Sequence, residues 1–286
     1  MTTKKFGCQL PQDTSDTNHI FEVAKDCESL GYDSVWTYDH LAPYWLHSRS
    51  SLEAWTLLSA IAARTSKIKI GSLVTNVSLR NPTLLAKMTS TVDNISGGRL
   101  IVGLGVGDRM SLEEMHSYGY MFPPLESRIT LLRETIMTLK AMWSGNEVSL
   151  SGRLVKVSNA LCVPKPKQQP GPPIWVGGRH RRVLDVAAEL ADGWNHWGLT
   201  RQKLARQEAY LLAACTRVHR NRDTITESWA GSLPTLPPDG LSVVESMRSE
   251  LILRNGDETD YFIASLPARA DRKAYECFAE AVRSIA

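Results

Sequence analysis

The 286-residue sequence has little net charge, few cysteines and no long hydrophobic run. Its formal charge of +3, with no lysine- or arginine-rich run among aromatic residues, argues against a nucleic-acid partner. The five cysteines lie far apart and in no CxxC spacing, so we expect reduced, mostly buried thiols. No apolar run reaches the ~20 residues of a membrane helix, and the first residues do not resemble a signal peptide. We therefore expect a soluble, cytoplasmic protein that binds no membrane.

Metal-binding and hydrolase motifs are also missing. The histidines form no HxH or HExxH pair, and Glu113 with His116 is too loosely spaced for a metal site. Ser72 and Ser78 lack the GxSxG context of a hydrolase nucleophile. We therefore expect no metal centre and no serine-hydrolase chemistry.

Strand and helix patterns alternate along the whole chain. Residues 67–75 and 100–107 have the pattern of buried strands and flank a predicted helix at 83–94, which makes a βαβ unit with parallel strands. The unit repeats, so that eight strands are expected: 5–10, 33–37, 67–75, 100–107, 173–178, 192–195, 228–233 and 261–266. Eight units predict one α/β domain over residues 1–286, a (β/α)8 TIM barrel with insertions at its C-terminal mouth. A doubly wound open sheet is the alternative.

Two segments do not follow the repeat. Residues 144–172 contain a predicted hairpin, turning at Ser151-Gly152, and a proline-rich connector, and we interpret them as an insertion on the barrel. Residues 234–258 show no pattern that predicts an element, and we expect a loop that helps to shape the substrate pocket together with 42–51 and 108–124. Trp45, in the polar loop 42–51, is the tryptophan most expected to face a ligand.

Asp39 and His40 follow the predicted strand 33–37, at the strand end where such barrels bind ligands. A carboxylate and an imidazole at this place can transfer a proton or stabilise charge on a reacting ring. A helix-capping aspartate beside a solvent-facing histidine would have the same spacing. The residues alone leave both interpretations open.

The run Gly103-Leu-Gly-Val-Gly-Asp108 differs from a dinucleotide-binding fingerprint, because Asp108 stands where the third glycine is required and no helix begins at once. Its repeated glycines still allow a flat ligand to approach the backbone closely. Asp108 can act as an acid or base, or can cap the next turn. The run therefore predicts a binding surface for a planar ligand, with Asp108 at its edge.

Residues 177–182, Gly-Gly-Arg-His-Arg-Arg, lie between a predicted strand and a predicted helix. Backbone N–H groups, a helix N-terminus and positive side chains suit an anion such as phosphate. A solvated basic first turn is the alternative, although cations at a helix start oppose the helix dipole. We favour the phosphate site.

Several of these stretches together resemble a known family. They are residues 33–41, 53–58, 63–71, 80–88, 95–100, 122–124, 172–178 and 191–195. Over about residues 5–198 the chain resembles the bacterial-luciferase-like monooxygenase superfamily and, within it, the oxidoreductases that depend on the deazaflavin coenzyme F420. The resemblance implies an eight-stranded barrel that binds its cofactor at the C-terminal mouth.

The resemblance also implies roles for individual residues. Asp39 would hold the polar edge of the cofactor ring, His40 would handle a proton near its reactive face, and a non-proline cis peptide at Ser72-Leu73 would support the ring. Asp108 stands where deazaflavin enzymes often carry glutamate, which leaves its acid or base role open. Cofactor contacts would come from Asp39, Ser72, Leu73, Thr75, Gly105, Val106 and Gly107, and phosphate contacts from Gly177, Gly178 and Arg179.

The expected function is therefore hydride transfer between coenzyme F420 and a small organic substrate. One alternative is an FMN-dependent two-component monooxygenase that receives reduced flavin and activates O₂. Another is a carrier or sensor that binds the cofactor without catalysis. A homodimer is expected by resemblance, and a separate reductase that supplies reduced cofactor is a further expected partner.

Overall fold

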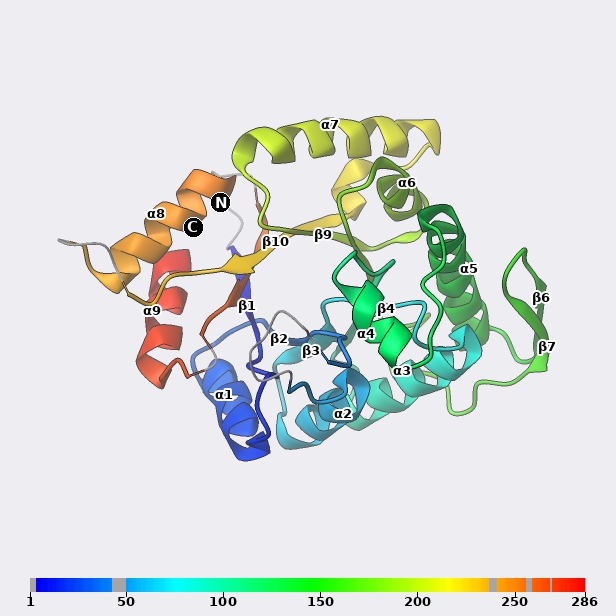
Figure 1. The fold of residues 1–286 in the computed structure, drawn as a ribbon, viewed down its shortest axis with the longest axis horizontal. Helices are drawn as coiled ribbons and strands as arrows, with labels where there is room; N and C mark the ends of the chain where they lie inside the picture. The colour runs from blue at the N-terminus through cyan, green and yellow to red at the C-terminus, as the bar shows by residue number, and fades with distance from the viewer. Residues whose placement is uncertain (1–3, 43–49, 237–240, 256–258, 268, 286) are drawn as a thin grey trace.

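The chain forms a closed parallel barrel. The computed structural model describes residues 4–42, 50–236, 241–255, 259–267 and 269–285. The barrel strands are β1 (Lys5–Gln9), β2 (Ser34–Thr37), β3 (Lys69–Ser72), β5 (Leu100–Gly105), β8 (Ile174–Gly177), β9 (Gly193–Trp197), β10 (Thr226–Ser232) and β11 (Tyr261–Ser265). All neighbours pair in parallel, and the β1–β11 and β3–β5 pairings close the ring (Figure 1). The predicted (β/α)8 barrel is confirmed, because a doubly wound sheet would leave two open edges.

Helices connect the strands and cover the outside of the barrel. They are α1 (Thr17–Ser29), α2 (Ala54–Arg64), α3 (Pro82–Ser96), α4 (Ser111–Ser117), α5 (Leu125–Ser144), α6 (Arg181–Leu190), α7 (Arg201–Arg217), α8 (Val243–Asn255) and α9 (Arg272–Arg283), with a 3₁₀ turn at Arg222–Thr224. Local signals set several ends: Asn81 caps α3 by accepting from Thr83 N, and Gly97 ends it in the left-handed conformation. None of the described helices combines the length and apolar character that crossing a bilayer requires.

Helix α8 corrects the expectation of a loop over 234–258. Its apolar residues lie on both sides of the helix, since Met247 and Leu251 are buried whereas Ile252 and Leu253 are exposed. An apolar stripe on one face is the periodic signal that identifies a helix from sequence, and this segment lacks it. The segment 237–240 within the same range lies outside the described residues.

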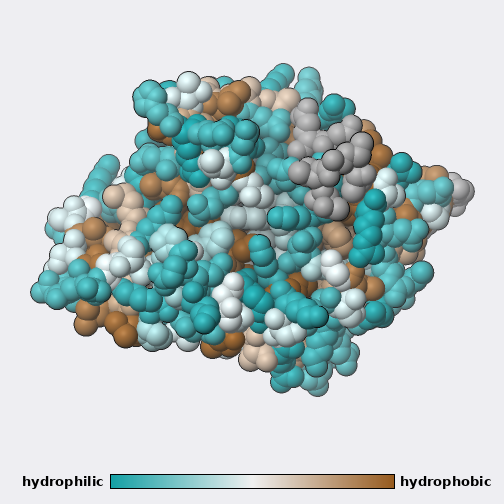
Figure 2. All heavy atoms as spheres, turned by 180° about the vertical axis from the view of Figure 1, so that it is seen from behind, coloured by the Kyte–Doolittle hydropathy of each residue, from teal (hydrophilic) through white to brown (hydrophobic). Residues whose placement is uncertain are grey.

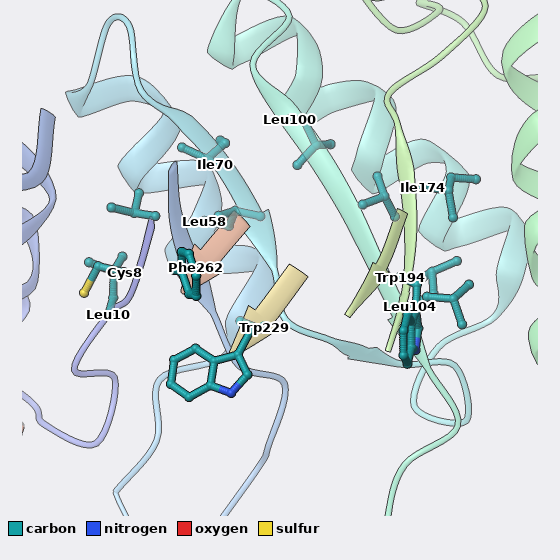
Figure 3. Packing of buried hydrophobic residues seen from close by; sticks show 14 of the residues in the cluster. Cys8, Leu10, Leu58, Ile70, Leu100, Leu104, Ile174, Trp194, Trp229 and Phe262 are labelled. Atoms are coloured by element: carbon teal, nitrogen blue, oxygen red, sulfur yellow. The ribbon is translucent and has the colours of Figure 1, made fainter. Parts of the chain in front are cut away.

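The main core lies between the strands and the helices. Figure 3 shows part of it, with Leu104, Trp194 and Trp229 on the outward side of the barrel strands. All five cysteines are free and buried, as expected from their spacing. The rear face of the molecule is mostly hydrophilic with scattered apolar residues (Figure 2).

A second, smaller core fills the inside of the barrel. The rings of Trp36 and Trp175 lie 5.1 Å apart, and Tyr261 packs edge-on against Trp175 at 5.3 Å. Glycine makes room for these rings: a Cβ at Gly71 would lie 2.4 Å from Trp36, and one at Gly193 would lie 2.4 Å from Trp175. The aromatic rings close the barrel below the mouth, the end at which the carboxyl ends of the strands meet.

The third strand of the barrel is interrupted, which corrects its predicted extent of 67–75. β3 ends at Ser72, and the chain pairs again with β5 only at β4 (Thr75–Asn76). The non-proline cis peptide lies at Leu73–Val74, one bond beyond the predicted Ser72-Leu73. Leu73 N still donates to Thr37 O (2.7 Å), so the regular ladder with β2 continues through Leu73 and the irregularity begins after it.

Residues 144–172 lie away from the mouth. β6 (Val148–Ser151) and β7 (Lys156–Ala160) form an antiparallel hairpin, and the Glu134 carboxylate accepts from the backbone of its turn at 153–155. The turn occupies residues 152–155, so the predicted turn at Ser151-Gly152 begins one residue early. Gln168 donates to Leu100 O, the first residue of β5, which places the connector at the amino end of the barrel. The mouth is built instead by the segments after β2, after β3 and after β5.

His196 is a buried histidine in the layer between barrel and helices. Its exposure is 0%, and among the described residues neither ring nitrogen has a hydrogen-bond partner. The nearest carboxylate oxygen, Oε1 of Glu227, lies 3.7 Å from Nε2, beyond hydrogen-bond distance. Burial lowers the pKa of His196 to about 4. The negative charge of Glu208 opposes this shift, and the positive charge of Arg179 adds a smaller contribution to it. The side chain is therefore neutral at pH 7.

This burial predicts a loss of stability in acid. An unfolded His196 takes up its proton near the usual pKa of 6.5, whereas the folded chain resists protonation until about pH 4. The free energy of unfolding should therefore fall by roughly 3 kcal/mol as the pH drops through this window, from this residue alone. Urea unfolding at several pH values should show that this part of the pH dependence of the free energy of unfolding disappears in His196→Leu. It should remain in His219→Asn, at an exposed position, and an unchanged slope in His196→Leu would contradict the assignment.

Candidate active site at the mouth of the barrel

Asp39 is buried at the mouth and held by a cation. Its Oδ2 accepts from Arg80 Nη1 (2.6 Å), and its Oδ1 accepts from Arg80 Nη2 (2.8 Å). Asn76 N also donates to Oδ2 (3.0 Å), and Arg80 Nη2 reaches Glu53 Oε1 (2.5 Å). Burial opposes the charge of Arg80, but hydrogen bonds and charge from Asp39 and Glu53 outweigh it and raise the pKa of Arg80. Three of the carboxylate's acceptor positions are thus used inside the protein, which favours a role for Asp39 in fixing the ends of β2 and β4.

His40 is paired with a buried carboxylate that the sequence did not single out. His40 Nδ1 lies 2.7 Å from Glu114 Oε1, and Ala42 N donates to Glu114 Oε2 (3.3 Å). The side chain of Glu114 is 1% exposed and that of His40 is 20% exposed. A carboxylate at Nδ1 fixes the tautomer with Nδ1–H, so that a proton-transfer partner would meet Nε2. His40 and Asp39 therefore have separate partners although they are adjacent in the chain.

Asp108 begins the segment that brings Glu114 to His40. Its Oδ1 accepts from Ser111 N (3.0 Å) and Ser111 Oγ (3.1 Å), at the start of α4. This is the capping role that the sequence allowed as an alternative. Asp108 is exposed, and its use as an acid or base stays a prediction.

Arg128 fixes the backbone at Val106 and Gly107. Its Nη1 donates to Val106 O (2.5 Å) and Gly107 O (2.7 Å), and its guanidinium lies over the Phe122 ring at 4.0 Å. Burial lowers the pKa of Arg128, and the charge of Asp108 partly opposes this shift. Gly107 adopts φ +67°, and a Cβ there would lie 2.8 Å from the Asn76 amide, so this position requires glycine. The end of β5 is therefore packed tightly against the residue whose N–H holds Asp39.

Ser72 and Thr75 form an internal hydrogen-bond chain. Trp55 Nε1 donates to Thr75 Oγ1 (3.1 Å), Thr75 Oγ1 donates to Ser72 Oγ (2.7 Å), and Ser72 Oγ donates to Gly103 O (3.0 Å). Both hydroxyl side chains are fully buried. These hydrogen bonds connect Ser72, before the strand interruption, with Thr75, after it. Because both hydroxyl groups are used in this way, a cofactor would meet the backbone of this segment and not its hydroxyl groups.

Val74 forms an apolar platform over three glycines. A Cβ at Gly105 would lie 2.4 Å from Val74 Cγ2, one at Gly177 would lie 2.7 Å from Val74 Cγ1, and one at Gly103 would lie 3.2 Å from the same atom. The valine side chain occupies the space that side chains at these strand ends would take, and it remains partly exposed. A planar apolar ring fits on such a surface, because β5 and β8 end in glycine beside Val74 and so have no side chain there that would stand above the valine.

The end of β8 differs in detail from the predicted phosphate site. Gly178 N donates to Asn195 O (3.1 Å), so this N–H is used within the barrel. Arg181 lies over the Tyr210 ring at 5.3 Å, Arg182 pairs with Glu126, and His180 Nδ1 accepts from Arg182 N at the start of α6. Arg179 is exposed beside this helix start. A phosphate contact would therefore involve Arg179 and the first turn of α6, with Gly177 and Gly178 providing close approach.

The structure brings most of the predicted residues to one end of the barrel. Trp45 lies outside the described residues. Three residues that the sequence did not assign to the site complete it: Arg80, Glu114 and Val74. Arg80 and Glu114 could have been suspected as charged residues close to predicted strand ends, but their partners depend on the loop paths. Within the described part of the chain, no group of three or more His, Cys, Asp or Glu residues could hold a metal ion.

Comparison with known proteins identifies relatives of this chain. The profile of the family described as "Luciferase-like monooxygenase" matches residues 1–228. The chain is 29% identical over 193 residues to an "F420-dependent glucose-6-phosphate dehydrogenase" of Amycolatopsis mediterranei, covering 66% of this chain and 56% of that protein. It is 30% identical over 174 residues to a "5,10-methylenetetrahydromethanopterin reductase" of Methanolobus tindarius, covering 61% of this chain and 48% of that protein. The chain thus spans about half the length of these curated relatives.

The fold is also shared with a solved structure. An "F420-dependent secondary alcohol dehydrogenase in complex with an F420-acetone adduct" superposes with a TM-score of 0.82 at 16% identity, covering 100% of this chain and 98% of that one. At this identity the similarity establishes the common barrel.

Proposed function

Because the chain belongs to the luciferase-like monooxygenase family, we propose that it is an oxidoreductase that uses coenzyme F420 to transfer a hydride to or from a small organic substrate. The observation that carries this proposal is the His40–Glu114 pair at the edge of the mouth, beside the strand interruption that forms the Val74 platform. The names of the two relatives reported above, one an F420-dependent dehydrogenase, support the choice of F420.

The residues present fit a planar cofactor with a phosphate group. The Val74 platform would support the ring, the backbone of Leu73 and of 105–107 would border it, and Arg179 would bind the phosphate. When bound, the deazaflavin supplies or accepts the hydride, that is, two electrons and a proton together. Asp39, with Arg80 and Asn76, would keep the strand ends that border the ring in place.

His40 would move the second proton of the reaction. In the reducing direction the substrate gains one hydride and one proton, and the proton would come from Nε2 of His40; in the oxidising direction Nε2 would take it up. Glu114, by holding Nδ1–H, would keep Nε2 in the orientation for this transfer. Its burial keeps water from competing for the Nδ1 hydrogen bond.

Titration with both cofactors tests the proposal. Purified protein should bind F420 more tightly than FMN, and Arg179→Ala should weaken F420 binding by at least about tenfold, since a charge-assisted hydrogen bond contributes about 1.5–3 kcal/mol. The change can be followed by cofactor fluorescence. Arg206→Ala, at an exposed position on α7, should leave binding unchanged.

The family description favours one second candidate, a flavin monooxygenase. Tight FMN binding without F420 binding would replace our proposal with this reading. A homodimer, a reductase that supplies reduced cofactor and a cytoplasmic location belong to the same proposal. Equilibrium sedimentation of the purified chain would test the dimer.

A further inference from the structure

The inner rim of the mouth has two different halves. On β5 and β8 the inward residues nearest the mouth are Gly105 and Gly177, under the Val74 platform. On β9, β10, β11 and β1 the corresponding inward residues carry side chains: Trp197, Ser232, Ser265 and Gln9. Ser232, Ser265 and Gln9 are register partners on three adjacent strands. The glycine half suits a flat cofactor, and the second half leaves side chains to recognise another molecule.

Strand alternation places Trp197 on the inner face. Along β9, Gly193 faces the ring of Trp175 inside the barrel, and Asn195 donates to Ser228 Oγ (2.9 Å), its register partner on the neighbouring strand β10. Trp194 and His196, at the alternating positions, are fully buried under the helices. Trp197 is two residues beyond Asn195 at the last position of β9, so its indole lies on the inward side at the mouth.

Trp197 is unusually exposed for a tryptophan of this chain. Six others, Trp36, Trp55, Trp143, Trp175, Trp194 and Trp229, are 0–4% exposed, whereas Trp197 is 45% exposed. A large aromatic side chain at the rim of a ligand-binding mouth is a favourable stacking surface. In the strand order β2-β1-β11-β10-β9, four steps separate β9 from β2 in an eight-stranded ring. Trp197 and His40 therefore lie at opposite sides of the mouth.

We propose that Trp197 determines substrate specificity by stacking on a planar, uncharged substrate, an aromatic or conjugated carbonyl compound. Gln9, Ser232 and Ser265 would hydrogen-bond its carbonyl or hydroxyl groups, since amide and hydroxyl side chains both donate and accept. These four inward positions carry no cation, whereas a sugar phosphate is best bound by arginine or lysine. The inference rests on the proposed function, and it assigns this chain a substrate class different from that in the name of its dehydrogenase relatives.

Binding of two probes to the F420-loaded protein tests the inference. Menadione, planar and uncharged, should bind more tightly than glucose 6-phosphate. Trp197→Ala should raise the Kd for menadione by about tenfold, and Trp197→Phe, which keeps an aromatic face, should raise it by less than about threefold. The Kd for F420 should stay within about twofold in both variants, because the proposed cofactor contacts come from Val74, the backbone of 105–107 and Arg179 and not from Trp197. Leu212→Ala, exposed on α7, is the control and should change neither value.

Two results would overturn the inference. One is tighter binding of glucose 6-phosphate than of menadione, or no menadione binding at all. The other is an equal loss of F420 and menadione binding in Trp197→Ala, which would make Trp197 a cofactor contact. Failure of the wild-type protein to bind F420 would overturn the proposed function, and this inference with it. Protein that binds F420 but not menadione would overturn only the inference.

Discussion

Replacing His40 by alanine is expected to lower kcat for hydride transfer by about 100- to 10,000-fold, the usual contribution of a positioned acid or base. The Kd for F420 should change little, because the proposed ring and phosphate contacts come from Val74, the backbone of 105–107 and Arg179. Stopped-flow oxidation of reduced cofactor would measure the rate, and fluorescence titration the affinity. His219→Asn, at an exposed position with φ +54°, is the matched control and should keep full activity.

Glu114→Gln tests the proposed role of Glu114, which is to orient His40 and not to transfer the proton itself. Glutamine keeps the size of the side chain but can donate to Nδ1, which favours the opposite tautomer. We expect a lower kcat with an unchanged Kd for F420, and a changed tautomer in the nitrogen NMR shifts of His40. Unchanged turnover in both His40→Ala and Glu114→Gln would favour the non-catalytic reading, a carrier or sensor of the cofactor.

Removing the carboxylate of Asp39 is expected to cost the most in stability. In Asp39→Ala the Arg80 guanidinium, 10% exposed, loses its two-pronged partner and keeps only Glu53. Removing one partner of a buried ion pair typically lowers the free energy of unfolding by about 3–5 kcal/mol, and the remaining contact with Glu53 places the expected loss near the lower figure. Urea unfolding followed by circular dichroism would measure it.

The matched control is an ion pair at the surface. Asp26 pairs with Arg272, and the two side chains are 32% and 47% exposed. Asp26→Ala should therefore cost no more than about 1 kcal/mol. Equal losses in Asp39→Ala and Asp26→Ala would show that the buried pair contributes nothing beyond an ordinary surface pair.

The barrel itself could be predicted because its signals are local. Each strand is a short apolar run followed by turn residues, and each predicted helix repeats its apolar residues at helical spacing, as in α1 and α9. The position of His40 at a strand end followed from the same pattern. Helix α8 could not be found in this way, because its apolar residues do not form one stripe.

The partners within the site could not be predicted, for a different reason. Glu114 lies 74 positions from His40, and Arg80 lies 41 positions from Asp39. No periodicity links such residues, because their meeting depends on the paths of the loops above the barrel. The break in the third strand after Ser72 was not predicted, and the cis peptide was expected one bond early, at Ser72-Leu73. Val74, which follows, packs against glycines from two other strands, a contact that no local pattern reveals.

The His40–Glu114 pair also has a consequence for loop exchange. Glu114 belongs to α4, within the segment that joins β5 to α5, and this segment is held by Asp108 and Ser111. A graft that replaced residues 108–124 to alter substrate choice would also remove the partner that orients His40. Exchange of this loop would therefore be expected to lower turnover whatever it did to substrate choice, and chimaeras that retain Asp108, Ser111 and Glu114 are the ones expected to remain active.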